Sequence, residues 1–355
     1  MSYMVILKLF LAVIISALFS FYLVPLCIFI AKRLQFLDSP DGKIKRQSRA
    51  VPYLGGIAVF VGFVISLVLL LPFSSNLMPL ALGAALLLFV GLVDDLVVLK
   101  PYQKLFGQFI AVLCFLKHGL YLKEAFFLRS LWAIPVSALW MLSVINAYNL
   151  VDVMDGLATT LAIWSCLAFG LVAMLSENIP VAIFLASFVG SLVGFFWYNK
   201  PNAQIYLGDA GSLFIGGVMA NIPFLLSWGG SAQYGLIAPI FMLAVPLLEV
   251  WSLICIRSIK GIPFYHASPH HFSLYLARRG WSKWNVLVIS GVFSLLFSIA
   301  GLMIVFNIEP ILIFLFIFAV LLSWAVLIFR KPKVVWRFFV LLVAGDFRRS
   351  IAAPR

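Results

Sequence analysis

The chain has 355 residues, of which 64% are hydrophobic and only 10% are charged, and its mean hydropathy is +1.14. Soluble globular domains carry about 25% charged residues, so this composition excludes that class and predicts an integral membrane protein with several spans. The net charge of +13 would suit a nucleic-acid partner, but the placement of the basic residues along the chain explains it as membrane topology instead, and we expect no nucleic-acid partner.

Apolar runs recur along the whole chain, and a spanning helix needs about 20 such residues. The eleven candidate runs, a few of them short, are Met4–Ile30, Val51–Leu71, Leu77–Val93, Leu105–Leu116, Leu131–Ile145, Leu157–Leu175, Val181–Trp197, Ser212–Trp228, Leu236–Ile256, Val286–Phe306 and Ile311–Phe329. They predict an all-α polytopic membrane protein with about 10–11 transmembrane helices, in one domain that covers 1–355. The first run lacks a basic start and is too long for a signal-peptide core, so we expect a retained anchor.

Lysine and arginine fall mainly on one side of the predicted membrane. If the N-terminus is outside, 21 of the 25 basic residues lie in the inside loops 31–50, 94–104, 198–211 and 257–283 and in the tail from 330. Because cytoplasmic loops accumulate Lys and Arg, the N-terminus is predicted outside and the C-terminus in the cytoplasm. The basic tail 330–355 contains an apolar stretch, Val334–Ala344, which is a candidate for a helix on the inner membrane surface.

The first inside loop is basic and leads to two adjacent glycines. Lys45 and Arg46 are candidates for holding phosphate, although positive charge at this place also serves to orient the chain in the membrane. Gly55 and Gly56 permit close approach of the backbone by either a neighbouring helix or a phosphate. Both interpretations stay open for this segment.

Carboxylates stand at the inside ends of several predicted spans. Asp94 and Asp95 end the third run, and two adjacent acids repel each other unless a proton or a cation lies between them. Mg²⁺ together with substrate phosphates would satisfy them, whereas two solvated aspartates in a loop are the simpler alternative. Asp209 opens the eighth run and could be a plain helix cap, but it shares the inside face with the other aspartates.

Two amides and two carboxylates lie between the fifth and the sixth run. These residues are Asn146, Asn149, Asp152 and Asp155. Acids at membrane depth are costly and persist where they bind a cation or move protons, whereas a helix cap would need only one of the four. This cluster therefore predicts a functional site at the inside face.

Two further polar features follow in the second half of the chain. Pro246 interrupts the ninth run and Glu249 follows it, which predicts a broken helix that faces a polar cleft; a buried structural pair is the alternative. His270 and His271 lie in the last inside loop. Adjacent histidines lack the usual metal-chelating spacing, so they favour hydrogen bonds or charge toward phosphate over a metal site, with a solvated loop as the alternative.

Together these features resemble the polyprenyl-phosphate N-acetylhexosamine-1-phosphate transferase family, which includes the phospho-N-acetylmuramoyl-pentapeptide transferase and the initiators of O-antigen and teichoic-acid synthesis. The resemblance covers nearly the whole chain. It rests on five blocks in one order: Pro52-x-x-Gly55-Gly56, Asp94-Asp95, Asn146-x-x-Asn149-x-x-Asp152-x-x-Asp155-Gly156-Leu157, Tyr206-Leu207-Gly208-Asp209-Ala210-Gly211-Ser212, and a histidine loop before the tenth run.

The resemblance implies a multi-pass enzyme of the bacterial inner membrane that uses Mg²⁺, or Mn²⁺. It would transfer a sugar 1-phosphate from a UDP-sugar to a polyprenyl phosphate in the membrane, release UMP, and initiate a cell-envelope polysaccharide, with a homodimer as the implied assembly. Such chemistry needs a cation and a cleft at the membrane surface. The implied catalytic residues are Asp94, Asp95 and Asp155, the implied metal ligand is Asp209, and the implied substrate-binding residues are Lys45, Arg46, Asn146, Asn149, Asp152, Glu249, His270 and His271.

The chain departs from the family pattern at three places, and the last of them bears on the choice of sugar. Val153 stands where a glycine is usual, Gln47 stands near a common histidine, and His271 is followed by Phe272 rather than by a third histidine. The His-His-Phe sequence is similar to the muramoyl enzyme, but the loop lacks the full pattern of that enzyme. We therefore favour UDP-N-acetylglucosamine or a close relative as donor, with phospho-N-acetylmuramoyl-pentapeptide transfer as the alternative.

Two other membrane-protein classes share single features with the chain. CDP-alcohol phosphotransferases also use Asp-x-x-Asp-Gly, but their motif continues with further aspartates on the next turns, whereas no aspartate follows Asp155 until Asp209. An ion-coupled transporter would explain Glu249 in a broken helix. Transporter sites lie near the membrane midplane between repeated halves, however, and here five aspartates lie at one face and no repeat is visible.

Overall fold

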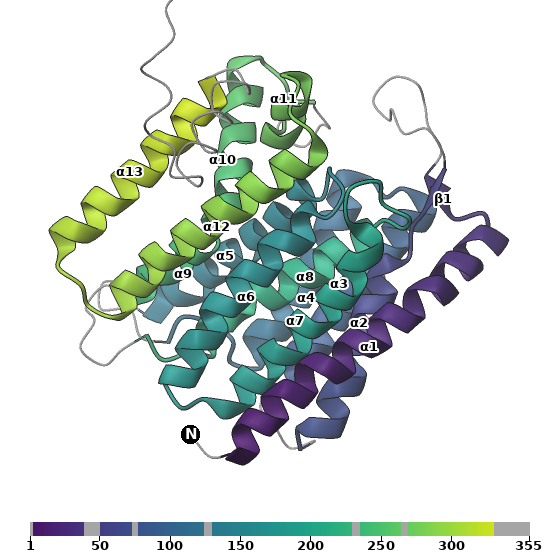
Figure 1. Cartoon of the computed structure of the whole chain (residues 1–355), viewed down its shortest axis with the longest axis horizontal. Helices are drawn as coiled ribbons and strands as arrows, with labels where there is room; N and C mark the ends of the chain where they lie inside the picture. Colours follow the sequence, from purple (N-terminus) through teal and green to yellow (C-terminus); the bar gives the residue numbers. More distant parts are fainter. Residues whose placement is uncertain are drawn as a thin grey trace, which may run out of the picture.

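The computed structural model describes residues 3–38, 50–72, 77–123, 130–228, 235–263 and 269–329, and these form a helical bundle (Figure 1). The helices are α1 (Tyr3–Arg33), α2 (Gly55–Leu70), α3 (Met78–Val97), α4 (Pro101–Lys117), α5 (Ser130–Val151), α6 (Leu157–Leu175), α7 (Ile179–Asn199), α8 (Gly208–Asn221), α9 (Ala238–Met242), α10 (Ala244–Ile259), α11 (Phe272–Arg278), α12 (Lys283–Val305) and α13 (Pro310–Phe329). The predicted class, an all-α polytopic membrane protein, is confirmed.

Each of the eleven apolar runs contains at least one helix. Six helices of the described part are long and apolar enough to cross a membrane, namely α1, α3, α5, α6, α7 and α12. The segments Gly235–Met242 and Ala244–Ile259 would form a seventh span, bent by 73° at the break between them. The break predicted for this run is confirmed, while the count of 10–11 spans stays a prediction because α2, α4, α8 and α13 are short or less apolar.

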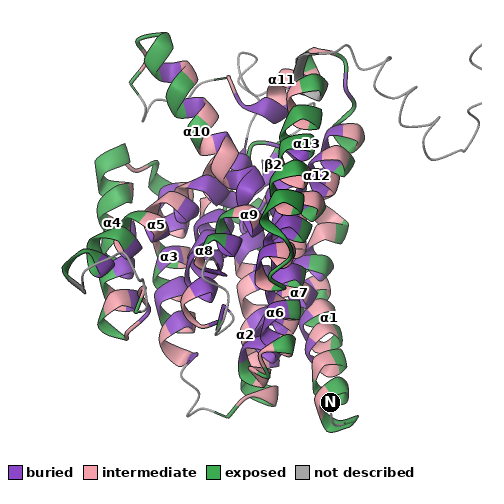
Figure 2. Cartoon of the chain, turned by 90° about the vertical axis from the view of Figure 1, so that its left-hand side faces the viewer, coloured by how far each residue is buried: buried purple, intermediate pink, exposed green. Residues whose placement is uncertain are grey.

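Helix α8 lies at the centre of the bundle, where it packs against α2, α3 and α5. All of its residues except Asp209 are buried, as expected for a helix that is apolar on every side. Figure 2 shows this buried interior surrounded by exposed outer helix faces. Asp209, in the first turn, is thus the one residue of this helix that is not buried.

Glycines bring the neighbouring helices close to the start of α8. A Cβ atom on Gly91 of α3 would lie 2.2 Å from the carbonyl oxygen of Asp209, and one on Gly56 of α2 would lie 2.3 Å from the nitrogen of Gly211. Real Cβ atoms do not approach so closely, so the helices meet through backbone contact that only glycine allows. The end of α3, with its two aspartates, is therefore held against the N-terminus of α8.

A two-stranded antiparallel hairpin closes the first inside loop. Strand β1 (Leu37–Asp38) pairs with β2 (Val51–Pro52), and the loop 39–49 between them, which contains Lys45 and Arg46, lies outside the described residues. The backbone of Tyr206 extends this pairing, since its N–H donates to the carbonyl of Pro52 at 2.9 Å. The hairpin is thereby joined to the segment that leads into α8.

The hairpin, α10 and α11 lie at the end of the molecule opposite to the N-terminus, in both Figure 1 and Figure 2. This end carries the loops that the basic residues predict to be cytoplasmic. The predicted surface helix in the tail 330–355 lies outside the described residues.

Candidate active site

The ammonium group of Lys104, in the first turn of α4, is the centre of the site. Its Nζ lies 2.9 Å from Oδ2 of Asp94 and 2.8 Å from Oδ2 of Asp209, and it donates to Oδ1 of Asn149 at 3.1 Å. These three contacts use the three donors of a lysine ammonium. Helices α3, α4, α5 and α8 each contribute one side chain to this polar centre.

Asp95 faces the N-terminus of α8 rather than the ammonium. Its Oδ1 accepts the backbone N–H of Asp209 at 2.8 Å, and its Oδ2 accepts that of Ala210 at 3.0 Å. A carboxylate in this place satisfies free donors of the first helical turn and complements the helix dipole. Gly208 has a φ of +75° and comes so close that a Cβ atom would lie 2.6 Å from Oδ2 of Asp95. Asp95 thus fixes the turn that carries Asp209.

Asn149 fixes the side chain of Asp209 from the opposite direction. Its Nδ2 donates to Oδ1 of Asp209 at 2.5 Å and to Oγ of Ser212 at 2.9 Å. The side chain of Asp94 is 8% exposed and that of Asp209 is 33% exposed. Asp209 is therefore the more accessible of the two carboxylates that contact Lys104.

Asp155 holds two other parts of the chain together. Its Oδ2 accepts the backbone N–H groups of Asn202 at 3.0 Å and Ala203 at 3.3 Å, and Nζ of Lys283 lies 2.7 Å away. These bonds tie the α5–α6 turn to the segment before α8 and to the first residue of α12. They favour a structural role for Asp155, and its predicted catalytic role stays a prediction.

Asp152 follows α5 directly and is half-buried. Burial and the negative charges of Asp209, Asp95 and Asp155 raise the pKa of its carboxyl well above the ordinary range. The carboxylates of the cluster therefore interact electrostatically although they come from three segments, the end of α3, the α5–α6 turn and the start of α8. A cation that enters the cluster lowers this repulsion.

Asn146 makes a contact that its sequence position did not indicate. Its Nδ2 donates to Oε1 of Gln108 at 2.7 Å, and Nε2 of Gln108 donates back to Oδ1 of Asn146 at 3.3 Å. This amide pair links α4 to α5 one turn away from the contact between Lys104 and Asn149. It aligns the two helices, and a substrate contact of Asn146 stays a prediction.

Lys104 and Gln108 are the site residues that sequence reasoning missed. Lys104 stood in an inside loop, where a basic residue is explained by topology alone. Two features of the sequence could have indicated them. Pro101 favours a helix start just before Lys104, and the spacing of four residues puts Lys104 and Gln108 on one face of that helix.

The predicted histidine residues lie at the start of α11. Nδ1 of His271 lies 2.8 Å from Oε1 of Glu249, and both side chains are buried. Glu249 is therefore engaged with His271, which is the buried pair considered above as an alternative to substrate binding. Nζ of Lys260 lies 2.6 Å from Nε2 of His270. Burial and the positive charges of Lys260, Arg278 and Arg257 lower the pKa of His270, which favours its neutral form.

The residues around Lys104 fit a divalent cation by their chemistry. Within the described ranges, no group of three or more His, Cys, Asp or Glu side chains stands ready to hold a metal ion. The oxygens of Asp94, Asp209 and Asn149 nevertheless converge on one positive charge, and such hard donors suit Mg²⁺, which takes one or two carboxylates and completes its shell with phosphate oxygens and water. The predicted metal ligand Asp209 belongs to this set.

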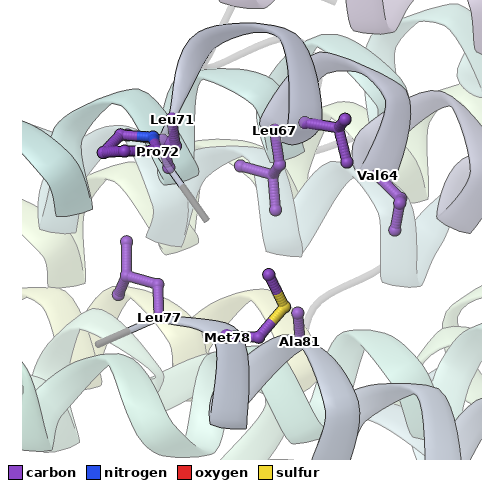
Figure 3. A pocket seen from close by; sticks show the side chains of 8 residues that line it. Val64, Leu67, Leu71, Pro72, Leu77, Met78 and Ala81 are labelled. Atoms are coloured by element: carbon purple, nitrogen blue, oxygen red, sulfur yellow. The ribbon is translucent and has the colours of Figure 1, made fainter. Parts of the chain in front are cut away.

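An apolar pocket between α2 and α3 lies away from this site. Figure 3 shows side chains of both helices around it, including Val64, Leu67 and Met78. Its volume of about 60 Å³ is far below the 300–1,000 Å³ of typical ligand pockets. Met78 begins α3 and Asp94 lies 16 residues later, about 24 Å along the helix, so the pocket contributes nothing to the acidic cluster.

Comparison with known proteins gives a consistent result. Residues 77–227, which include most of the site, match the model of glycosyl transferase family 4. A phospho-N-acetylmuramoyl-pentapeptide-transferase of Lactobacillus gasseri is 32% identical over 76% of this chain and 89% of its own length. An undecaprenyl-phosphate alpha-N-acetylglucosaminyl 1-phosphate transferase of Thermotoga maritima is 30% identical over 81% of this chain and 88% of its own length. A third relative, from Staphylococcus carnosus and with the same name as the first, is 29% identical over 81% and 97%.

Proposed function

Because the chain belongs to glycosyl transferase family 4, we propose that it transfers an N-acetylhexosamine 1-phosphate from a UDP-sugar to a polyprenyl phosphate. An oxygen of the lipid phosphate forms a bond to the sugar-bearing phosphorus of the UDP-sugar, and the bond from that phosphorus to UMP breaks. The products are a polyprenyl-diphosphate sugar and UMP. The reaction takes place at the cytoplasmic face of a bacterial inner membrane.

The observation that carries this proposal is the convergence of Asp94, Asn149 and Asp209 on one cation at the ends of buried helices. Transfer between two anionic phosphates depends on positioning and on neutralising charge rather than on covalent work by the protein. Asp94 and Asp209 can supply positioning and charge neutralisation together, because the two carboxylates that now bind the Lys104 ammonium can instead hold a metal cation. That cation in turn binds the diphosphate of the donor. A chain with only a structural role has no need of this arrangement.

The geometry favours Asp94 over Asp95 as the residue that acts on the reacting phosphates. Both oxygens of Asp95 accept backbone N–H groups at the start of α8, so this carboxylate is committed to positioning Asp209. Asp94 has one oxygen bound to the N–H of Leu99, while the other lies 2.9 Å from the ammonium of Lys104. That second oxygen is free to act once the lysine moves to a substrate phosphate.

Asp209, with Asn149 and Asp94, would hold Mg²⁺. The ion would supply charge neutralisation on the diphosphate and stabilise the leaving UMP. Asp209 is the accessible carboxylate of the set, which suits a ligand that a metal–nucleotide complex reaches from solvent.

For the donor we favour UDP-N-acetylglucosamine, with UDP-N-acetylmuramoyl-pentapeptide as the second candidate. Relatives of both specificities match with similar identity, so the preference rests on the incomplete histidine pattern at His270 and His271.

The test is UMP release by the purified full chain in detergent with undecaprenyl phosphate, Mg²⁺ and each of three donors: UDP-N-acetylglucosamine, UDP-N-acetylgalactosamine and UDP-N-acetylmuramoyl-pentapeptide. We expect release that requires both lipid and metal, fastest with UDP-N-acetylglucosamine. D94N should lower kcat by about 10²–10⁴-fold, the range of general acid–base effects. E309Q, at the opposite end of the molecule, is the matched control. Absence of release with all three donors, or full activity of D94N, would overturn the proposal.

A further inference from the structure

Glu249 lies on the buried face of α10, one turn after Pro246. The buried residues of this helix recur at helical spacing and are Ala244, Val245, Pro246, Glu249, Leu253 and Arg257. Glu249 itself is 2% exposed. Enclosing a carboxylate to this degree is costly unless it is paired and hydrogen-bonded, so its partners indicate its purpose.

Two partners of Glu249 belong to the start of α11, more than 20 residues away along the chain, and the positive charge of Arg257 acts on it from the same buried face of α10. Nδ1 of His271 lies 2.8 Å from Oε1, and the backbone N–H of Phe272 donates to Oε2 at 3.4 Å. The carboxylate therefore contacts one ring and one backbone group of the same short segment. It fixes the position of that segment and the rotation of the imidazole together.

The hydrogen bond also determines which nitrogen of His271 is available. A carboxylate only accepts, so Nδ1 must carry a proton toward Glu249, and Nε2 is the nitrogen left for another partner. Carboxylates orient imidazoles in the same manner in hydrolase triads and behind metal-bound histidines. For stability alone, a buried ion pair gains little over apolar side chains of equal volume.

The surroundings of His271 suit an anionic partner. Nζ of Lys260 lies 2.6 Å from Nε2 of the neighbouring His270, and the guanidinium of Arg278 donates to the carbonyl of Pro269. Two cationic side chains therefore flank the start of α11, and they also lower the pKa of His270. Helices α10 and α11 lie at the same end of the molecule as the hairpin that is joined to the α8 segment (Figures 1 and 2). A substrate phosphate at that end would lie near Lys260 and Arg278, and Nε2 of His271 is the ring nitrogen that Glu249 leaves available to it.

We propose that Glu249 is a positioning residue that holds His271 with Nδ1–H toward its carboxylate and Nε2 toward a phosphate oxygen of the UDP-sugar. This inference rests on the function proposed above. Glu249 does not touch the substrate and acts only through His271. The sequence predicted substrate contacts for both residues, whereas the contacts of Glu249 favour a role in orienting His271.

The first test is the protonation of the His271 ring, measured by ¹⁵N NMR of the histidine-labelled full chain in nanodiscs. The signals of His271 are assigned by their loss in H271A. We expect a protonated Nδ1 in the wild type and loss of this state in E249A. An unprotonated Nδ1 in the wild type, or an unchanged ring in E249A, overturns the proposal.

The second test is kinetic and uses the UMP-release assay. Removing the carboxylate that orients a functional histidine lowers activity by about 10–100-fold. We therefore expect E249A to lower kcat/KM for the UDP-sugar by that amount. The double variant E249A/H271A should be no slower than H271A alone, because Glu249 acts through the ring. E249Q keeps the side-chain volume and one acceptor oxygen, so it should fold and lose less than E249A. E309Q is again the control.

The two proposals fail in different ways. A wild-type protein that releases no UMP overturns the function and with it the phosphate contact of His271. A wild type that releases UMP, while E249A matches its kcat/KM or adds to the loss of H271A, overturns the role of Glu249 alone.

Discussion

Lys104 lies between Asp94 and Asp209, where we propose that Mg²⁺ binds. The substitution K104A leaves two carboxylates facing each other, and removing one partner of a buried pair costs about 3–5 kcal/mol, less where solvent reaches the group as it does at Asp209. We therefore expect a lower Tm for K104A in EDTA and a partial recovery when Mg²⁺ is added. K104A should also bind Mn²⁺ more tightly than the wild type does, as measured by EPR without substrate.

The control for this variant is K100A, since Lys100 precedes α4 and is exposed. K100A should have the wild-type Tm in EDTA and in Mg²⁺. A K104A protein whose Tm does not respond to Mg²⁺ would show that the three oxygens around the ammonium do not form a metal site.

Asp152 gives a pH-dependent prediction at the same scale. Its pKa is raised by burial and by three neighbouring carboxylates, so the folded protein binds a proton at this carboxyl more tightly than the unfolded chain does. The stability that this group contributes is fully present below its unfolded pKa of about 3.9 and is lost as pH rises through the raised pKa. D152N should therefore raise the Tm at pH 8, and the gain should shrink as the pH is lowered. A gain of equal size at all pH values would argue against this cause.

At the scale of elements, the close contact between α3 and α8 sets the distance between Asp94 and Asp209. G91A adds a Cβ atom that would lie 2.2 Å from the carbonyl oxygen of Asp209, so the helices must move apart. Overpacking of this kind costs about 1–3 kcal/mol, and it also shifts Asp94 relative to Asp209. We expect G91A to lower both the Tm and the rate of UMP release.

G170A is the matched control, because a Cβ atom on Gly170 of α6 has nothing within 4 Å. Alanine is the better helix former by about 1 kcal/mol, so G170A should keep its activity and gain slightly in Tm. Equal activity of both variants would mean that the α3–α8 contact does not govern the site.

The helices and the acidic cluster were predictable because their signals are local. Long apolar runs indicate helices, and an aspartate at the end of such a run is rare enough to stand out, as Asp94 and Asp209 did. The lysines that contact these aspartates were not predictable in this way. Lys283 lies 128 residues from Asp155 and Lys104 lies 105 residues from Asp209, and a basic residue in an inside loop is already explained by topology. The packing of α3, α4, α5 and α8 joins Lys104 to Asp209, and the start of α12 brings Lys283 to Asp155.

At the scale of the whole molecule, the site, the hairpin and the start of α11 share one end, and the basic residues predict that this end is cytoplasmic. A UDP-sugar donor requires that orientation, because a nucleotide sugar is soluble and does not cross the bilayer unaided. The opposite end carries Glu309, between α12 and α13, while Tyr102 stands exposed at the start of α4 beside the site. These two positions test the orientation of the entire chain.

We expect single cysteines at these positions, in a chain whose four native cysteines are replaced by serine, to differ in labelling by a membrane-impermeant maleimide. In intact spheroplasts E309C should react and Y102C should not, whereas both should react after permeabilisation. Both variants keep the acidic cluster, so UMP release by the labelled E309C protein verifies its fold. The reverse labelling pattern would place Asp94, Lys104 and Asp209 outside the cell, away from the donor, and would contradict the topology and the proposed reaction together.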